Sequence, residues 1–132
     1  MESVEKIVLV MAGGGLGALC RYGFALGAAS ILGTRFPWET LLANMIGCLL
    51  IGIAFALSEQ TDILNPSARL FFMTGFLGAL TTFSTYALET VNHMRAGSHM
   101  AAINFLINNL GGGALVMTGF WLVRSILLKG GK

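Results

Sequence analysis

The feature that most constrains the fold of this chain is the spacing of its charged residues. Residues 40–58 and 70–88 are two windows of 19 residues with no acid or base, and residues 96–123 form a third window of 28 residues whose one titratable side chain is a histidine. Residues 7–34 contain a single charge, Arg21. A helix that crosses the hydrocarbon core of a bilayer needs about 20 mainly apolar residues. The sequence therefore predicts four transmembrane helices, over about residues 7–32, 38–57, 66–94 and 100–128.

The overall composition agrees with this interpretation. Charged residues make up 11% of the chain, against about 25% in a typical soluble domain. The helices of a soluble bundle would need polar faces, which these windows lack. We therefore expect an all-α membrane protein, with one transmembrane domain over residues 1–132 and both termini on the same side of the membrane. No nucleophile–base arrangement or metal-ligand spacing suggests an enzyme, and no basic cluster suggests a nucleic-acid partner.

The third predicted span contains an unusual block, residues 75–86, with the sequence GFLGALTTFSTY. Glycine costs about 1 kcal/mol against alanine inside a helix, and threonine and serine side chains can divert backbone hydrogen bonds. The block predicts a helix that breaks near its centre, and a break would free carbonyl oxygens that suit a hard cation such as Na⁺. The alternative is ordinary packing of small residues, with each hydroxyl bonded to its own helix.

Arg21 is a charge inside the first predicted span. Such a charge is costly, by about 2.5–3.5 kcal/mol, and marks either an ion path or a paired structural group. A positive group attracts anions. The alternatives are that Arg21 extends to the membrane interface or that it caps the carbonyls of a broken helix.

Asparagines form a second polar group within the spans. Asn44 lies in the second span, and Asn104, Asn108 and Asn109 lie in the fourth. Asn104 and Asn108 are four residues apart and therefore share a helix face. An amide offers two donors without a charge, so aligned amides can replace part of the hydration shell of an anion. Hydrogen bonding between helices is the alternative role, above all for Asn109.

Two further patterns concern rings and glycines. Phe83 and Tyr86 are three residues apart, and their positive ring edges could favour an anion, although packing or lipid contact is the ordinary role of such a pair. The spacing of Gly13 with Gly17, and of Gly23 with Gly27, permits close approach of a second helix backbone.

Taken together, these motifs resemble the Fluc family of fluoride channels. The resemblance covers nearly the whole chain and rests on Arg21-Tyr22, on residues 39–47 (ETLLANMIG) and, most specifically, on the 75–86 block. It implies an antiparallel, dual-topology homodimer in a microbial plasma (inner) membrane. Each dimer would hold two fluoride paths and a central structural Na⁺ at the two helix breaks, and would export cytoplasmic fluoride by passive flow.

The resemblance also assigns roles to individual positions. It implies that backbone carbonyls of Gly78 and Thr81 hold the Na⁺, and that Arg21 and Glu89 are charges near the vestibule and the path exit. The implied pore residues are uncharged donors or rings: Phe83, Tyr86, Asn44, Ser84, Thr85, Asn104 and Asn108.

Three of these positions depart from the family pattern. Tyr86 replaces a phenylalanine, and Asn104 and Asn108 stand where the family often has tyrosine and serine. All three departures keep a polar or aromatic side chain, so they bear on rate or affinity more than on function.

Two other functions remain open at this point. A small multidrug exporter also has four spans and forms dimers, but it needs an acid in mid-membrane, typically in the first span, where this chain has Arg21. A non-conducting scaffold would use its glycines and asparagines only to pack helices.

Overall fold

A computed structural model describes residues 2–130 of the chain, with side chains described as far as Leu128. Residues 1, 131 and 132 of the expected domain lie outside the described residues. Within the described part every element is helical. The first two spans are α1 (Ser3–Leu32) and α2 (Trp38–Gln60). The third span consists of α3 (Pro66–Arg69), η1 (Leu70–Leu77), α4 (Gly78–Leu80) and α5 (Phe83–Arg95), and the fourth of α6 (Met100–Leu106), η2 (Ile107–Gly111) and α7 (Gly112–Gly130).

The four predicted spans are confirmed, and all four are long and apolar enough to cross a membrane. The largest difference in a boundary is at the start of α1, which begins four residues before Ile7. There the Glu2 backbone N–H donates to Oε2 of Glu5 at 3.2 Å, so a polar capping turn extends the helix beyond its apolar part. At the third span, Oδ1 of Asn65 accepts from the Ala68 N–H at 2.9 Å, and Pro66 occupies the first helical position.

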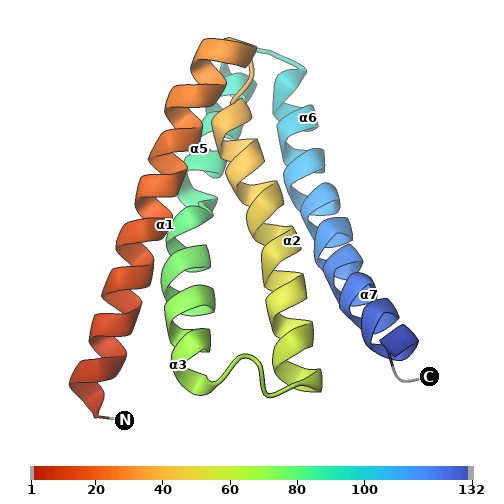
Figure 1. The fold of residues 1–132 in the computed structure, drawn as a ribbon. Helices are drawn as coiled ribbons and strands as arrows, with labels where there is room; N and C mark the ends of the chain where they lie inside the picture. The colour runs from red at the N-terminus through yellow and green to blue at the C-terminus, as the bar shows by residue number, and fades with distance from the viewer. Residues whose placement is uncertain (1, 131–132) are drawn as a thin grey trace.

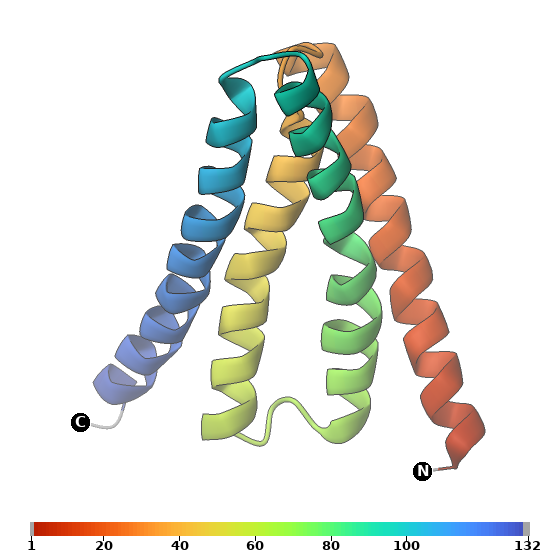
Figure 2. The ribbon, with the colours of Figure 1, turned by 180° about the vertical axis from the view of Figure 1, so that it is seen from behind.

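The helices converge at one end and diverge towards the other. The loops that join α1 to α2 and α5 to α6 lie at the narrow end, whereas both termini and the α2–α3 loop lie at the wide end (Figures 1 and 2). Both termini are thus on the same side, as predicted. Within the bundle, α1 packs mainly against η1, and α2 packs mainly against α7.

The contact between α1 and η1 depends on glycine. A Cβ atom added to Gly13 or Gly17 would overlap the carbonyl oxygen of Phe71 or Phe76, respectively, and one added to Gly75 would lie 2.8 Å from the carbonyl oxygen of Val10. The predicted close approach at Gly13 and Gly17 is therefore confirmed. The approach predicted at Gly23 and Gly27 is not made within this chain, because nothing lies within 4 Å of an added Cβ at either position.

Candidate functional site

The third span breaks at Thr81 and Thr82, near its middle. Both residues are extended, with φ/ψ of −82°/155° and −147°/120°, between the end of α4 at Leu80 and the start of α5 at Phe83. The predicted break is confirmed, but it follows the glycines of the 75–86 block instead of falling on them. Gly75 and Gly78 are helical, and Gly75 serves the contact with α1.

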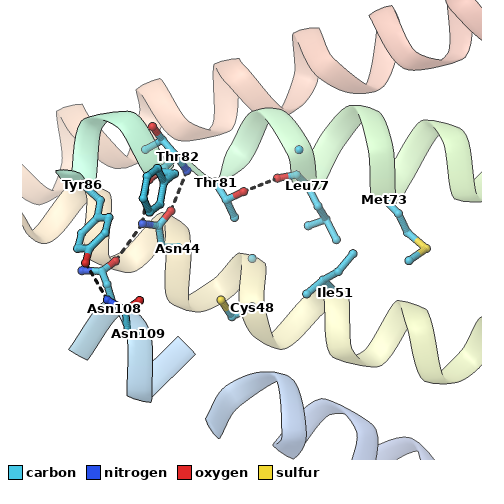
Figure 3. A pocket seen from close by; sticks show the side chains of 13 residues that line it. Asn44, Cys48, Ile51, Met73, Leu77, Thr81, Thr82, Tyr86, Asn108 and Asn109 are labelled. Carbon is cyan, nitrogen blue, oxygen red and sulfur yellow. Dashed lines mark hydrogen bonds between the residues drawn. The ribbon is translucent and has the colours of Figure 1, made fainter. Parts of the chain in front are cut away.

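The break is held by Asn44 of α2. In an uninterrupted helix the Thr82 N–H would donate to the Gly78 carbonyl. Here it donates to Oδ1 of Asn44 at 2.8 Å, and Nδ2 of Asn44 donates back to the Thr82 carbonyl at 3.2 Å (Figure 3). The Asn44 amide thus provides the acceptor that the Thr82 N–H lost at the break, and it is a second donor to the Thr82 carbonyl, which is the N-cap carbonyl of α5. The Gly78 carbonyl loses its helical partner as a result.

Asn44 is also the first member of a chain of amides, which we call the asparagine chain (Asn44, Asn108 and Asn104). Nδ2 of Asn44 donates to Oδ1 of Asn108, and Nδ2 of Asn108 donates to Oδ1 of Asn104, both at 2.9 Å. Asn104 then donates to Oγ1 of Thr90 at 2.9 Å, and that hydroxyl donates to the Tyr86 carbonyl at 2.8 Å. The predicted common face of Asn104 and Asn108 is confirmed.

The groups at the two ends of the asparagine chain determine which partner donates in each of its hydrogen bonds. The Thr82 N–H can only donate and the Tyr86 carbonyl can only accept, so none of the amides can be reversed. Nδ2 of Asn44 has two acceptors, and Nδ2 of Asn108 has two as well because it also donates to the Asn104 carbonyl at 3.0 Å. The asparagine chain therefore ties the break to the fourth span.

A cavity of about 370 Å³ lies beside the break, between α2, the two halves of the third span and η2 (Figure 3). It has no acid or base in its lining. The lining consists of Asn44, Gly47, Cys48, Ile51, Met73, Leu77, Gly78, Thr81, Thr82, Phe83, Tyr86, Asn108 and Asn109.

The cavity brings together six of the residues that the sequence singles out for the pore and the Na⁺ site: Asn44, Gly78, Thr81, Phe83, Tyr86 and Asn108. Three others do not line it. Asn104 is fully buried within the asparagine chain, and Ser84 and Thr85 are exposed in the first turn of α5.

Two polar residues of the cavity were not assigned to the site from the sequence. Thr82 is the N-cap of α5: its Oγ1 accepts from the Thr85 N–H at 3.3 Å and donates to the Thr85 hydroxyl at 3.0 Å. Threonine is a preferred N-cap residue, but Thr81 and Thr82 are adjacent, so the sequence does not say which of them caps α5. Asn109 joins Asn108 at the cavity within the wide π-helical turn η2, and helical periodicity alone gives no sign of such a turn.

The two rings stand at the start of α5. The centroids of Phe83 and Tyr86 are 5.7 Å apart and their planes are inclined by 61°, an edge-to-face arrangement. Phe83 is 78% exposed in this single chain, whereas Tyr86 is 6% exposed. Nδ2 of Asn109 donates to the Tyr86 hydroxyl oxygen at 2.7 Å. The predicted proximity of the two rings is confirmed.

The break also separates two opposite partial charges. The first N–H groups of α5 give its start positive character, and the last carbonyls of α4 give its end negative character. The start of a helix favours an anion, and freed carbonyls favour a cation. One interruption thus places backbone of positive character, at the start of α5, next to backbone of negative character, at the end of α4.

The two charges singled out from the sequence are not paired with each other. Oε1 of Glu89 accepts from the Thr40 hydroxyl at 2.6 Å, and its buried Oε2 has no hydrogen-bond partner among the described residues. Arg21 is half-buried on α1, and within residues 2–128 no hydrogen bond or ion pair engages it. In this chain it does not cap the carbonyls at the break.

Comparison with known proteins gives a consistent result. The family described as "CrcB-like protein, Camphor Resistance (CrcB)" matches residues 8–120. A protein of Desulfotalea psychrophila named "Fluoride-specific ion channel FluC" is 38% identical over 98% of this chain and 100% of its own length. Proteins of the same name are 44% identical in Salinibacter ruber, over 86% of both chains, and 39% identical in Maridesulfovibrio salexigens, over 94% of this chain and 99% of the relative.

Proposed function

The chain belongs to the CrcB-like family and is a multi-pass membrane protein, and from this premise we propose that it is a fluoride channel. It lets fluoride leave the cytoplasm of a microbe through the plasma membrane by passive electrodiffusion. The observation that carries the proposal is the interrupted third span, whose break lies beside an uncharged cavity lined in part by two amides that bond the break and by the Phe83 and Tyr86 rings.

Fluoride is small and strongly hydrated, so a path must replace its water with several donors that hold it only weakly. The exposed hydroxyls of Ser84 and Thr85, the edge of the Phe83 ring and the start of α5 are uncharged and lie at one place. Asn44 and Asn108 line the cavity beside the break together with Phe83, but both hydrogens of each amide already have acceptors. Their first role is therefore to hold the wall of the path in shape.

The path is completed by a second copy of the chain. Phe83, Ser84 and Thr85 are exposed in the single chain, and so is Gly78. Irregular backbone and hydroxyl groups at membrane depth are tolerated only where protein or a water-filled cavity covers them. An antiparallel homodimer would bring two breaks together at its centre and would give two pores, one beside each Phe83.

A structural Na⁺ fits the centre of such a dimer. The Gly78 carbonyl precedes the break and the Thr81 carbonyl lies within it, and the Gly78 carbonyl has lost its helical donor, because the Thr82 N–H bonds to Asn44. Carbonyls freed at a helix interruption are suitable Na⁺ ligands. When bound, the ion would supply a positive charge that holds the two breaks together.

Fluoride efflux from liposomes tests the proposal. Purified protein is reconstituted in vesicles loaded with potassium fluoride. A K⁺ ionophore is then added, so that K⁺ can leave with fluoride and no opposing membrane potential builds up, and a fluoride electrode records the release. The wild-type chain should release fluoride electrogenically. Phe83→Ile removes the ring edge at the exposed start of α5 and should abolish release, while the protein elutes from gel filtration as the wild type does.

The other two candidate functions predict different results. A multidrug exporter would exchange a cationic drug for protons, and its expected mid-span acid is replaced by Arg21 in α1. A scaffold would give no flux of either kind. Vesicles that keep their fluoride under a steep gradient would refute the channel.

A further inference from the structure

We propose that the phenolic O–H of Tyr86 is a hydrogen-bond donor to the anion in the cavity, and that Asn109 is the residue that positions it. The proposal rests on the proposed channel function and deepens it. It assigns a specificity role to a hydroxyl group that a phenylalanine at this position would lack.

The geometry fixes which partner donates in the Asn109–Tyr86 bond. Nδ2 of Asn109 lies 2.8 Å from the Phe105 carbonyl oxygen as well as 2.7 Å from the Tyr86 hydroxyl oxygen. A carbonyl can only accept, so a reversed amide would set two oxygens against each other at Phe105. The amide nitrogen therefore faces both partners and uses its two hydrogens, and the Tyr86 oxygen must accept.

The proton of the Tyr86 hydroxyl is consequently left free. Among the described residues no acceptor bonds to it, and its oxygen already takes one hydrogen from Asn109. Accepting that bond polarises the hydroxyl and makes it a better donor, because linked hydrogen bonds strengthen one another. A strong donor without an acceptor is thus placed in the cavity wall.

The surroundings of this donor select a small anion as its partner. Tyr86 and Asn109 line the same cavity as Phe83, and no acid or base lines it with them (Figure 3). The Tyr86 ring is itself buried and stands edge-to-face with Phe83, so its oxygen cannot turn far. A hydrogen bond to an ion is about twice as strong as one between neutral groups. Fluoride accepts such bonds more strongly than chloride, so the hydroxyl favours fluoride.

A double-mutant cycle on Tyr86 and Asn109 tests the proposal in the full-length dimer. The measurement is the fluoride concentration that gives half-maximal flux in liposomes, together with the fluoride-to-chloride flux ratio. Tyr86→Phe should raise the half-maximal concentration about tenfold, the lower end of the range for a hydrogen bond to a charged group, and should lower the flux ratio. Asn109→Ala should raise the half-maximal concentration about threefold, because the Tyr86 hydroxyl is still present but Asn109 no longer fixes its orientation.

The decisive expectation is that Asn109→Ala has no further effect once Tyr86 is phenylalanine, because Asn109 acts through the hydroxyl. Tyr22→Phe removes the same group from an exposed position on α1, and Asn92→Ala removes an exposed amide from α5. Both controls should leave the half-maximal concentration and the flux ratio unchanged. Asn109→Ser replaces Asn109→Ala if the alanine variant does not fold.

Two outcomes would overturn the inference while the channel function stands. An unchanged half-maximal concentration in Tyr86→Phe would remove the hydroxyl from the path. An equal effect of Asn109→Ala in the Tyr and Phe backgrounds would show that Asn109 acts independently of Tyr86. A wild-type protein that releases no fluoride would instead refute the proposed function itself.

Discussion

The third span is held in two different ways on the two sides of Leu80. Before Leu80, it touches α1 backbone to backbone, with Gly13, Gly17 and Gly75 removing the side chains that would keep the helices apart. After Leu80, it touches α2 and the fourth span through the asparagine chain, which bonds the broken backbone at Thr82.

The difference follows from whether the backbone hydrogen bonds of each part of the span are made within its own helix. A helix that keeps its internal hydrogen bonds needs only a close-fitting neighbour in lipid, where apolar burial gives little drive for association. A broken helix must find new partners for its freed backbone groups. The glycine contact therefore determines whether the bundle assembles, whereas the amide contact determines the shape of the break.

The largest expected effect is on the glycine side. Gly17→Ala would place a Cβ on the Phe76 carbonyl oxygen, and overpacking of this kind costs about 1–3 kcal/mol or more. Because backbone cannot move aside as a flexible side chain can, we expect α1 to separate from η1 and folded protein to be lost. Gly15→Ala is the matched control, since nothing lies within 4 Å of its added Cβ.

The measurement for this pair is the yield of monodisperse protein in detergent and its thermal midpoint. Gly15→Ala should match or exceed the wild type, because alanine favours a helix by about 1 kcal/mol over glycine. Equal thermal midpoints for the two variants would show that the α1–η1 contact does not depend on close backbone approach.

The next largest effect is expected at Asn44, where a substitution should change the shape of the break without preventing assembly of the bundle. Asn44→Leu leaves the N–H of Thr82 without its acceptor and removes the side-chain donor from the Thr82 carbonyl, and an unsatisfied buried group costs about 1–3 kcal/mol. We expect a folded protein with a lowered thermal midpoint and a fluoride flux reduced at least a hundredfold, because the break no longer holds its form. Flux at the wild-type rate would mean that the break keeps its shape without the amide.

The sequence is sufficient to predict the spans, the break and the glycine contact, because each rests on one local property: charge-free length, helix-weakening residues or a spacing of four. It also identifies most of the polar residues of the cavity. It does not predict how their hydrogen bonds are used. Asn104, for which the resemblance implies a place at the pore, lies buried between Asn108 and Thr90 in the single chain, because an amide that can bind an anion can equally bind another amide.

Asn109 illustrates the other limit. In a regular helix consecutive side chains point about 100° apart, so a position next to Asn108 would not be assigned to the same cavity. The π-helical turn η2 changes that relation, and both amides line the cavity. Helical periodicity in the sequence gives no sign of such a wide turn.

The smallest expected effect concerns the cap of α5, where the two kinds of contact meet. Thr82→Ala keeps the backbone bonds to Asn44 but removes the hydroxyl that accepts from the Thr85 N–H. Loss of such a cap costs about 1 kcal/mol. We expect a drop of a few degrees in the thermal midpoint and a modest fall in flux, because the asparagine chain still holds the break.

Thr82→Ser is the matched control for this prediction, since it keeps the hydroxyl and should restore both the thermal midpoint and the flux. If Thr82→Ala reduced flux as severely as Asn44→Leu, the hydroxyl and not the amide would hold the break. Thr82→Ala keeps the bonds from Asn44 to the Thr82 backbone. A loss of conduction in that variant would therefore show that the part of the third span after Leu80 depends on the cap of α5 and not on the asparagine chain.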